Sequence, residues 1–280
     1  MRLFLLTALT MVAFAANSVL NRLALIDGAM GPAAFAAVRL LSGAVVLVAL
    51  SAMRGSIQWG GSGRVGGVLS LAVYVLGFSF AYVSLPAGLG ALILFGGVQI
   101  TMFAGAVLAK EDVPITRWIG AVMAFGGLVW LLWPTGGADV SYPIGALALM
   151  AGAAVGWGIY SLLGRGARQP LQMTAVNFAW ASPIALLVFA ILPDGVSGYG
   201  IALAIMSGAI TSGLGYALWY SVLPGLGATR AAVAQLTVPV IALAGGMVFL
   251  GEALTLRFAV SCVLVLGGIA VSLIKPRRPN

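Results

Sequence analysis

Aromatic side chains recur every four residues in one stretch of the sequence, a pattern that can build the wall of a ligand site. Tyr74, Phe78 and Tyr82 share one face of a predicted helix, because side chains four positions apart lie one above another. Buried tyrosines and tryptophans need hydrogen-bond partners, so such a face suits a pocket for an amphipathic solute. A shift of 138 positions (74 to 212) leads to a second such face, made of Ser212, Tyr216 and Tyr220.

Further candidates lie inside other apolar stretches. Phe14 and Asn17 correspond, at a shift of 143 positions (14 to 157), to Trp157 and Tyr160. Two interpretations stay open for each of them: helix packing or an interfacial aromatic belt, and the wall of a substrate cavity. Taken together they favour the cavity. The residues predicted to bind substrate are Asn17, Arg39, Phe78, Tyr82, Gln99, Trp157, Tyr160, Trp180, Tyr216 and Trp219.

The acidic residues give no support for catalysis or metal binding. All six lie in predicted links or at the ends of apolar stretches, and the chain has no histidine. We therefore predict no catalytic residue, no metal and no cofactor, and a protein that is not an enzyme. Glu111 and Glu252 each precede a predicted helix, so we expect each to cap the N-terminus of the helix that follows it.

Arg39 is the one basic residue expected inside an apolar stretch. It lies seven residues into that stretch (32 to 39), which corresponds to roughly 10 Å at the helical rise per residue. Its side chain is expected either to extend to the membrane interface or to donate to a substrate carboxylate at the edge of a cavity.

Composition assigns the chain to the membrane. Of 280 residues, 62% are apolar and 7% are charged, against roughly 25% charged residues in a soluble domain. The net charge is +8, but the basic residues are scattered between apolar stretches and form no basic stripe, so nucleic acid is not an expected partner. The expected partner is the lipid bilayer.

Apolar stretches of about 20 residues predict an all-α protein with ten transmembrane helices. They lie near 3–21, 32–53, 65–84, 87–109, 115–133, 143–164, 172–192, 198–222, 228–250 and 256–274, with turn-forming residues such as Pro224-Gly225 between them. The start of the chain also resembles a signal peptide cleaved after Ala13-Phe14-Ala15. We favour a retained helix, because this stretch has a counterpart later in the chain.

Basic residues predict the orientation. With ten spans, eleven of the 14 lysines and arginines lie on the side of both termini, two lie on the other side, and Arg39 lies within a span. The positive-inside rule then places both termini in the cytoplasm. The eleven are Arg2, Arg54, Arg64, Lys110, Arg117, Arg165, Arg168, Arg230, Lys275, Arg277 and Arg278, and the two are Arg22 and Arg257.

The two halves of the chain share a pattern. Arg22 corresponds to Arg165, Leu85-Pro86 to Leu223-Pro224, and Glu111 to Glu252, in the same order and at shifts of 143, 138 and 141 positions. Five spans is an odd number, so the second copy must enter the membrane from the opposite side. The sequence therefore predicts two inverted five-helix repeats, residues 1–136 and 141–280, that form one membrane domain, an arrangement typical of secondary transporters.

The residues also resemble a known family. The stretch Leu250-Gly251-Glu252-Ala253-Leu254-Thr255, the pair Gly267-Gly268 and Pro239 are similar to the EamA type of the drug/metabolite transporter (DMT) superfamily, over residues 3–274. The first half departs from this pattern, with Lys110 in place of a glycine and Val98 in place of a proline. Within the family the chain is similar to YddG-like amino acid exporters.

The resemblance implies export of a small metabolite, and the aromatic faces favour a neutral or aromatic amino acid. Alternating access at a central cavity between the repeats is the expected mechanism, in the inner (plasma) membrane of a bacterium. A multidrug or other metabolite facilitator of the same superfamily is the alternative, and a channel or a polytopic membrane enzyme is the alternative from another class.

Overall fold

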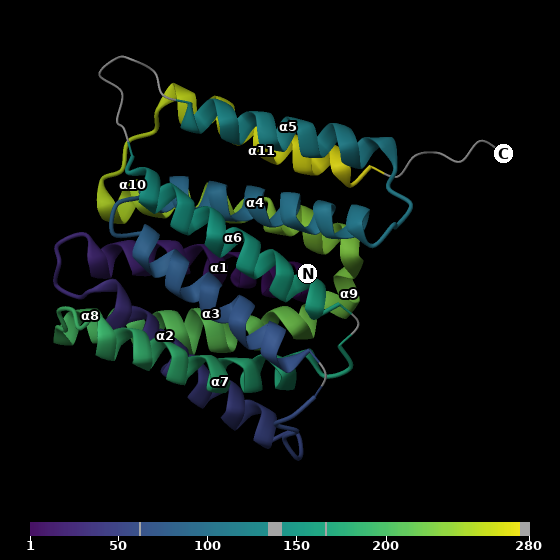
Figure 1. The fold of residues 1–280 in the computed structure, drawn as a ribbon. Helices are drawn as coiled ribbons and strands as arrows, with labels where there is room; N and C mark the ends of the chain where they lie inside the picture. The colour runs from purple at the N-terminus through teal and green to yellow at the C-terminus, as the bar shows by residue number, and fades with distance from the viewer. Residues whose placement is uncertain (62, 134–141, 166, 275–280) are drawn as a thin grey trace.

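The chain folds into a bundle of helices. The computed structural model describes residues 1–61, 63–133, 142–165 and 167–274, without the side chains of residues 227–229, and these residues contain no strand. The links predicted at Pro134 to Gly137 and the basic residues from Lys275 onward lie outside the described residues. The helices are α1 (Arg2–Leu25), α2 (Pro32–Ala52), α3 (Arg64–Ala81), α4 (Ala87–Leu108), α5 (Ile115–Leu132), α6 (Ile144–Leu163), α7 (Pro170–Ile191), α8 (Gly198–Ile205), the π-helix η1 (Met206–Leu214), α9 (Gly215–Gln235), α10 (Thr237–Leu250) and α11 (Leu256–Ser272) (Figure 1).

Within the described residues these twelve elements make ten apolar helical spans. Nine stretches of 18 or more residues within the described chain have the length and hydropathy of a span, and Leu256–Ser272 is a shorter apolar helix. Helix α8, η1 and the first part of α9 together make the eighth span, Gly198–Leu226. The predicted all-α membrane fold of about ten helices is confirmed.

The eighth and ninth spans are joined differently from the prediction. The sequence predicts a link at Pro224-Gly225, yet α9 continues through Pro224. Proline lacks the N–H that would bond to the carbonyl four residues earlier, but the rest of the helix can remain formed around one missing bond. The equivalent Pro86 lies outside a helix, where it is the N-cap of α4.

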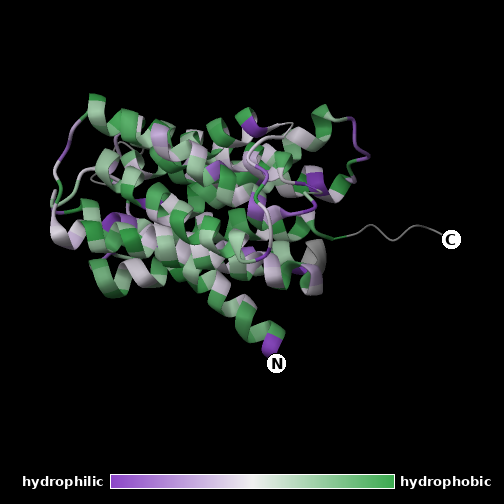
Figure 2. Cartoon of the chain, turned by 90° about the horizontal axis from the view of Figure 1, so that it is seen from below, coloured by the Kyte–Doolittle hydropathy of each residue, from purple (hydrophilic) through white to green (hydrophobic). Residues whose placement is uncertain are grey.

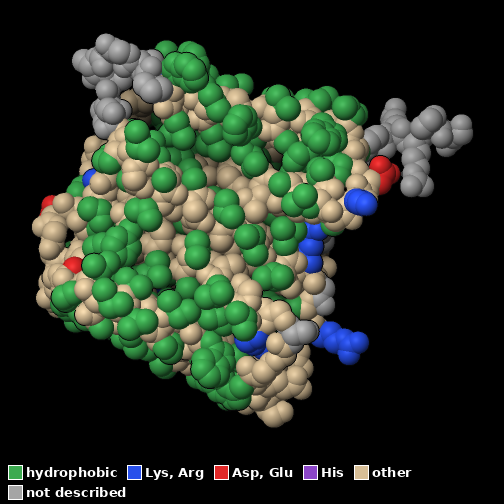
Figure 3. Space-filling model, viewed as in Figure 1, with side chains coloured by type: hydrophobic (Ala, Val, Ile, Leu, Met, Phe, Trp, Pro, Cys, Tyr) green, Lys and Arg blue, Asp and Glu red, His purple; other side chains and the backbone are tan. Residues whose placement is uncertain are grey.

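The surface of the bundle is apolar over its middle and charged at its ends. Hydrophobic residues predominate along the helices in Figure 2, and their side chains cover much of the surface in Figure 3. Large ones such as Val248 and Phe125 are exposed. Lysine and arginine side chains gather at the right-hand end in Figure 3, the end at which helix α11 finishes in Figure 1. This is the surface expected of a protein solvated by lipid.

The helices pack in pairs that bring distant parts of the sequence together. Helix α3 packs on α6, and α1 packs on α8, η1 and α9, while α2 packs on α7. Helix α5 packs on α11, a pair that lies along the upper edge of Figure 1. The first and last five spans are therefore interleaved rather than separated.

Glycines allow α5 and α11 to approach closely. A Cβ atom added to Gly268 would lie 2.6 Å from the carbonyl oxygen of Gly120 and 2.7 Å from the backbone nitrogen of Ala124. A Cβ atom added to Gly120 would clash with the backbone of Gly268 in return. Small residues at such a contact are how helices associate in lipid, where the hydrophobic effect gives no attraction between them.

We predict that Gly268→Val destabilises the protein by about 1–3 kcal/mol, since backbone atoms of α5 cannot move away as a flexible side chain would. The matched control is Gly267→Val, because an added Cβ at Gly267 meets nothing within 4 Å. Thermal unfolding in detergent, followed by loss of the monodisperse species, measures both. Equal stability of the two variants would contradict the packing described here.

Candidate substrate cavity

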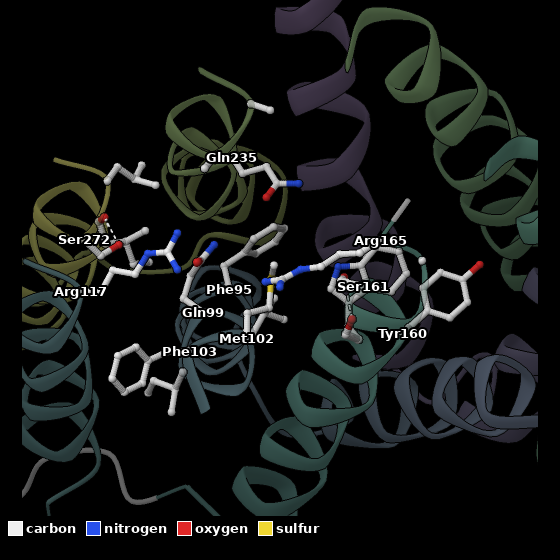
Figure 4. A pocket seen from close by; sticks show the side chains of 18 of the residues that line it. Phe95, Gln99, Met102, Phe103, Arg117, Tyr160, Ser161, Arg165, Gln235 and Ser272 are labelled. Carbon is white, nitrogen blue, oxygen red and sulfur yellow. Dashed lines mark hydrogen bonds between the residues drawn. The ribbon is translucent and has the colours of Figure 1, made fainter. Parts of the chain in front are cut away.

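A cavity of about 790 Å³ lies between α4, α5, α6, α9 and α11. Phe95, Met102 and Phe103 of α4 supply apolar wall, and polar groups reach into the same space from several helices (Figure 4). The polar and charged lining residues are Gln99, Glu111, Arg117, Tyr160, Ser161, Arg165, Tyr216, Tyr220, Gln235 and Ser272. This size lies within the roughly 300–1,000 Å³ of small-molecule sites, and the mainly apolar lining with a few polar groups is also typical.

The cavity opens at one end of the bundle. Its lining includes Glu111 and Pro114 from the α4–α5 link, Arg165 from the end of α6, and Ile274 after α11. These residues lie at the same end of the helix bundle, which we call the mouth end. The opposite end, which holds Asp27, Tyr142 and Glu252, is called the far end.

An aromatic layer forms the floor of the cavity. Trp157 is stacked between Tyr160 and Tyr216, with ring centroids 5.3 Å and 5.4 Å apart and interplanar angles of 18° and 21°. Phe14 packs on Tyr216 at 5.6 Å and on Trp219 at 5.8 Å. The layer therefore joins α1, α6 and α9.

Arg39 lies behind this layer and is fully buried. Its Nη2 donates to the hydroxyl of Tyr74 at 3.0 Å, and its Nε donates to Ser212 Oγ at 3.4 Å. The guanidinium carbon lies 5.0 Å from the ring centre of Phe78 and 5.4 Å from that of Tyr74. The Nη1 atom is buried without a hydrogen-bond partner. Extension of Arg39 to the membrane interface, one of the two alternatives, is wrong, because the side chain is directed into the protein.

The π-helix η1 turns three hydroxyl groups toward α1. Asn17 Oδ1 accepts from Ser207 at 2.7 Å and from Thr211 at 2.6 Å, and Ser212 lies 3.5 Å away. A π-helix places side chains further apart in sequence on one face than an α-helix does. Asn17, Ser207, Thr211 and Ser212 thus form a buried cluster of neutral hydrogen-bonding groups beside Arg39, behind the floor of the cavity.

A second polar chain runs beside the cavity. The hydroxyl of Tyr160 donates to Thr174 at 3.0 Å, and Thr174 is 2.9 Å from the hydroxyl of Tyr220. Asn177 donates to Tyr160 at 3.4 Å and accepts from Arg64 at 2.9 Å. These contacts fix two rings of the cavity wall to α7.

The ten predicted site residues fall into three groups. Gln99, Trp157, Tyr160, Tyr216 and Trp219 line the cavity. The other buried ones lie behind its floor: Asn17, Arg39, Phe78 and Tyr82.

Trp180 lies away from the cavity. It is 52% exposed and lines a shallow outer groove with Arg64 and Val65. Helical periodicity alone could not show which face of this span is turned inward.

The cavity contains residues that the sequence analysis did not select. Phe95 and Phe103 lie four residues before and after Gln99, which was predicted, so the four-residue spacing could have indicated them. Neither Arg117 nor Arg165 was predicted to bind substrate, yet both side chains reach into the cavity in Figure 4. Their inward direction depends on how α5 and α6 pack, which the sequence does not give.

Glu252 caps a helix, but a different one from the helix expected. Its carboxylate accepts from the backbone N–H groups of Ala87 at 2.6 Å and Gly88 at 3.3 Å, at the start of α4. The helix that follows it, α11, is capped by Thr255. The cap expected from Glu111 is wrong: α5 begins after Pro114 without a side-chain cap, and Glu111 forms an ion pair with Arg165 at 3.1 Å instead. Burial raises the pKa of Tyr142, and the Glu252 carboxylate adds to this shift while Arg22 opposes it.

A similar cap lies at the start of α2. Asp194, in the link after α7, accepts from the N–H of Ala33 at 2.7 Å and from that of Ala34 at 3.0 Å. A helix start carries unpaired donors and a partial positive charge, so a carboxylate is a suitable partner. Both caps at the far end are supplied from the second half of the chain.

These features define a class: a multi-span membrane protein with a solute-sized cavity. The EamA-like transporter family matches residues 144–274. The chain is 44% identical over 274 residues to the "Uncharacterized protein PA1977" of Pseudomonas aeruginosa, which covers 97% of this chain and 94% of that protein. It is 25% identical over 253 residues to an "Uncharacterized transporter" of Archaeoglobus fulgidus, over 86% of this chain and 88% of that one.

A solved crystal structure of another protein has the same fold, with a TM-score of 0.68 over 94% of this chain and 97% of that chain at 23% identity. The chain belongs to the EamA-like transporter family, of the drug/metabolite transporter superfamily. It is a membrane transporter of small molecules.

We predict that a cysteine at position 161 reacts with a membrane-impermeant maleimide from the mouth end, because Ser161 lines the cavity. The background is Cys262→Ser, which removes the only native thiol. Ser212→Cys is the matched control, since Ser212 is fully buried behind the aromatic layer. Equal labelling of the two positions would contradict the floor assigned to Trp157 and Tyr216.

Proposed function

We propose that this protein is a secondary transporter that exports small metabolites, with neutral and aromatic amino acids as substrates. The observation that carries the proposal is the cavity itself: about 790 Å³, open at the mouth end and closed below by an aromatic layer. Rings can stack on the side chain of such a solute, while Gln99, Gln235 and Ser161 offer hydrogen bonds to its polar groups.

The proposed mechanism is alternating access between two inverted halves, residues 1–136 and 141–280. Helix packing supports this relation. The third span packs on the sixth (α3 on α6), and its counterpart, the eighth span (α8, η1 and α9), packs on the first (α1). The pairs α2–α7 and α5–α11 each join two equivalent spans. A two-fold axis in the membrane plane generates these pairs.

Arg39 is proposed to receive the carboxylate of the substrate once the aromatic layer opens. A buried guanidinium with an unpartnered Nη1 keeps the N–H donors of this atom ready for an anion. Tyr74 accepts from Nη2 and Ser212 from Nε, so the group is oriented before the ligand arrives. The cavity leads toward this position, because Trp157 contacts Tyr74 at 4.8 Å.

The proposed location is the inner membrane of a bacterium, with both termini and the mouth of the cavity in the cytoplasm. The basic residues at the mouth end support this orientation through the positive-inside rule. The relative in Pseudomonas aeruginosa is bacterial. A cavity that faces the cytoplasm is the state in which an exporter loads its substrate.

The closed far end argues against an open channel, since a channel needs a continuous path. A multidrug facilitator is the nearest alternative of the same superfamily. Arg165 is paired with Glu111, so Arg117 is the cavity arginine that would oppose a cationic drug, whereas a zwitterion can place its carboxylate toward it.

We predict that Trp157→Ala lowers uptake of a radiolabelled aromatic amino acid into proteoliposomes by about tenfold, the effect of losing about 1.4 kcal/mol of binding. Trp180→Ala is the matched control and is expected to transport normally, because Trp180 faces outward. Saturable, competable uptake identifies a carrier. Flux that rises linearly with concentration would count against it, and no flux of any of the standard amino acids would count against this substrate class.

We predict that Arg39 determines preference for a carboxylate. The wild-type protein is expected to transport an aromatic amino acid in preference to its amide, and Arg39→Gln to reduce that preference by about tenfold, since a hydrogen bond to a charged group contributes about 1.5–3 kcal/mol. Uptake of both compounds by each variant gives the ratio. If Arg39→Gln lowers transport of the amino acid and of its amide by the same factor, Arg39 has a structural role alone.

A further inference from the structure

Two equivalent turns present a glutamate at opposite ends of the bundle. Helix α10 ends at Gly251, which has a left-handed φ of 65°, and Glu252 follows it. Helix α4 ends next to Lys110, which has a left-handed φ of 55°, and Glu111 follows it. Both turns place a left-handed residue directly before the glutamate although a lysine replaces the glycine, while their hydrogen bonds differ: Glu111 N–H donates to Ala106 and Glu252 N–H donates to Gly246.

At the far end, Arg22 and Glu252 form hydrogen bonds with the backbone at the break between α3 and α4. The chain breaks between α3 and α4, and Pro86 cannot donate to the carbonyl of Tyr82 four residues earlier. Arg22 donates to that carbonyl at 2.9 Å and to the carbonyl of Val83 at 2.6 Å. Glu252 accepts the N–H groups that the break leaves free at the start of α4.

At the mouth end, the equivalent groups are bound to each other. Arg165 pairs with Glu111 at 3.1 Å, and both side chains are about half exposed beside the cavity. Helix α9 runs on through Pro224, so the N–H groups of Gly225 and Leu226, the equivalents of Ala87 and Gly88, lie within a helix.

We propose that these four residues form a pair of latches that exchange partners as the transporter turns over. In the state open at the far end, α9 breaks before Pro224, Glu111 accepts the N–H groups of Gly225 and Leu226, and Arg165 donates to the carbonyls of Tyr220 and Ser221. Arg22 and Glu252 then release α3 and α4, which join into one helix, and pair with each other.

The exchange is symmetric, so each end uses the same interactions in turn. Pro224 has no N–H to donate to the carbonyl of Tyr220, so this carbonyl is free to accept from Arg165. It corresponds to the carbonyl of Tyr82, which accepts from Arg22. No charge is added or removed in the exchange. An inverted pair of this kind gives two states of similar free energy, which a transporter needs if it is to pass between them. The inference rests on the alternating access proposed above.

The first experiment replaces each glutamate and follows both ends with thiol reporters in the Cys262→Ser background. Ser161→Cys reports access from the mouth end, and Ser18→Cys, at the equivalent position of the first half and 1% exposed, reports access from the far end. Right-side-out and inside-out vesicles are treated with an impermeant maleimide.

Glu252→Gln is expected to raise labelling of position 18 from the far end by about tenfold, the effect of weakening one hydrogen bond to a charged group. Glu111→Gln is expected to do the reverse, with position 18 labelled more slowly than in the parent and position 161 fully labelled. The controls are Asp112→Asn and Asp27→Asn, exposed neighbours that remove the same charge at each end. Changes in the same direction for both glutamates, or no change for either, would overturn the proposal.

The second experiment separates a latch from a simple ion pair. The double variant Glu111→Arg with Arg165→Glu restores the ion pair at the mouth end. If that pair only stabilises the fold, the exchange rescues labelling of position 18 to the parent level, and the proposal is overturned. If Glu111 must accept backbone N–H groups, an arginine there cannot do so, and labelling of position 18 stays low.

The labelling needs no substrate, so it is independent of the amino acid assignment. Opposite shifts for the two glutamates would support the latches even if no amino acid were transported. Saturable amino acid uptake with unshifted labelling would keep the transport proposal and reject the latches.

Discussion

Hydrocarbon offers no hydrogen-bond partner, so each helix that begins or breaks near the lipid core must find its partners inside the protein. This constraint explains the acidic residues at the far end. Glu252 covers the start of α4 and Asp194 the start of α2, each through two backbone N–H groups. Arg22 serves the complementary end, the carbonyls at the close of α3. These three charged side chains are therefore placed where the backbone leaves groups unpaired.

The same constraint shapes the interior behind the cavity. Arg39 is buried among hydroxyl groups and aromatic faces, with Tyr74 and Phe78 on one side and Ser212 on the other. A guanidinium keeps its charge in such a setting, and cation–π contacts compensate only part of the lost hydration. The aromatic layer of Tyr160, Trp157 and Tyr216 separates this charge from the cavity. Arg39 can therefore meet the contents of the cavity only if a ring of this layer moves.

The sequence predicts the spans well because lipid acts on average hydropathy, and hydropathy is a property of the chain alone. It predicts the cavity in part: Trp157 and Tyr160 of α6 and Tyr216 and Trp219 of α9 line it. Phe78 and Tyr82 of α3 were predicted in the same way and lie behind its floor, because helical spacing does not show which face of a helix meets the cavity. It could not assign Trp180, because the inward face of α7 depends on which helices surround it. The target of Glu252 was missed for a related reason: the capped helix starts 165 residues away.

The caps at the far end have a consequence for how the protein is made. Helices α2 and α4 are synthesised long before Asp194 and Glu252, the residues that satisfy their first N–H groups. When the first five spans leave the ribosome and enter the bilayer, those starts depend on water or lipid headgroups at the surface. The early half completes its own structure only when nearly the last helix has been translated, so the order of biosynthesis and the order of folding differ in this chain.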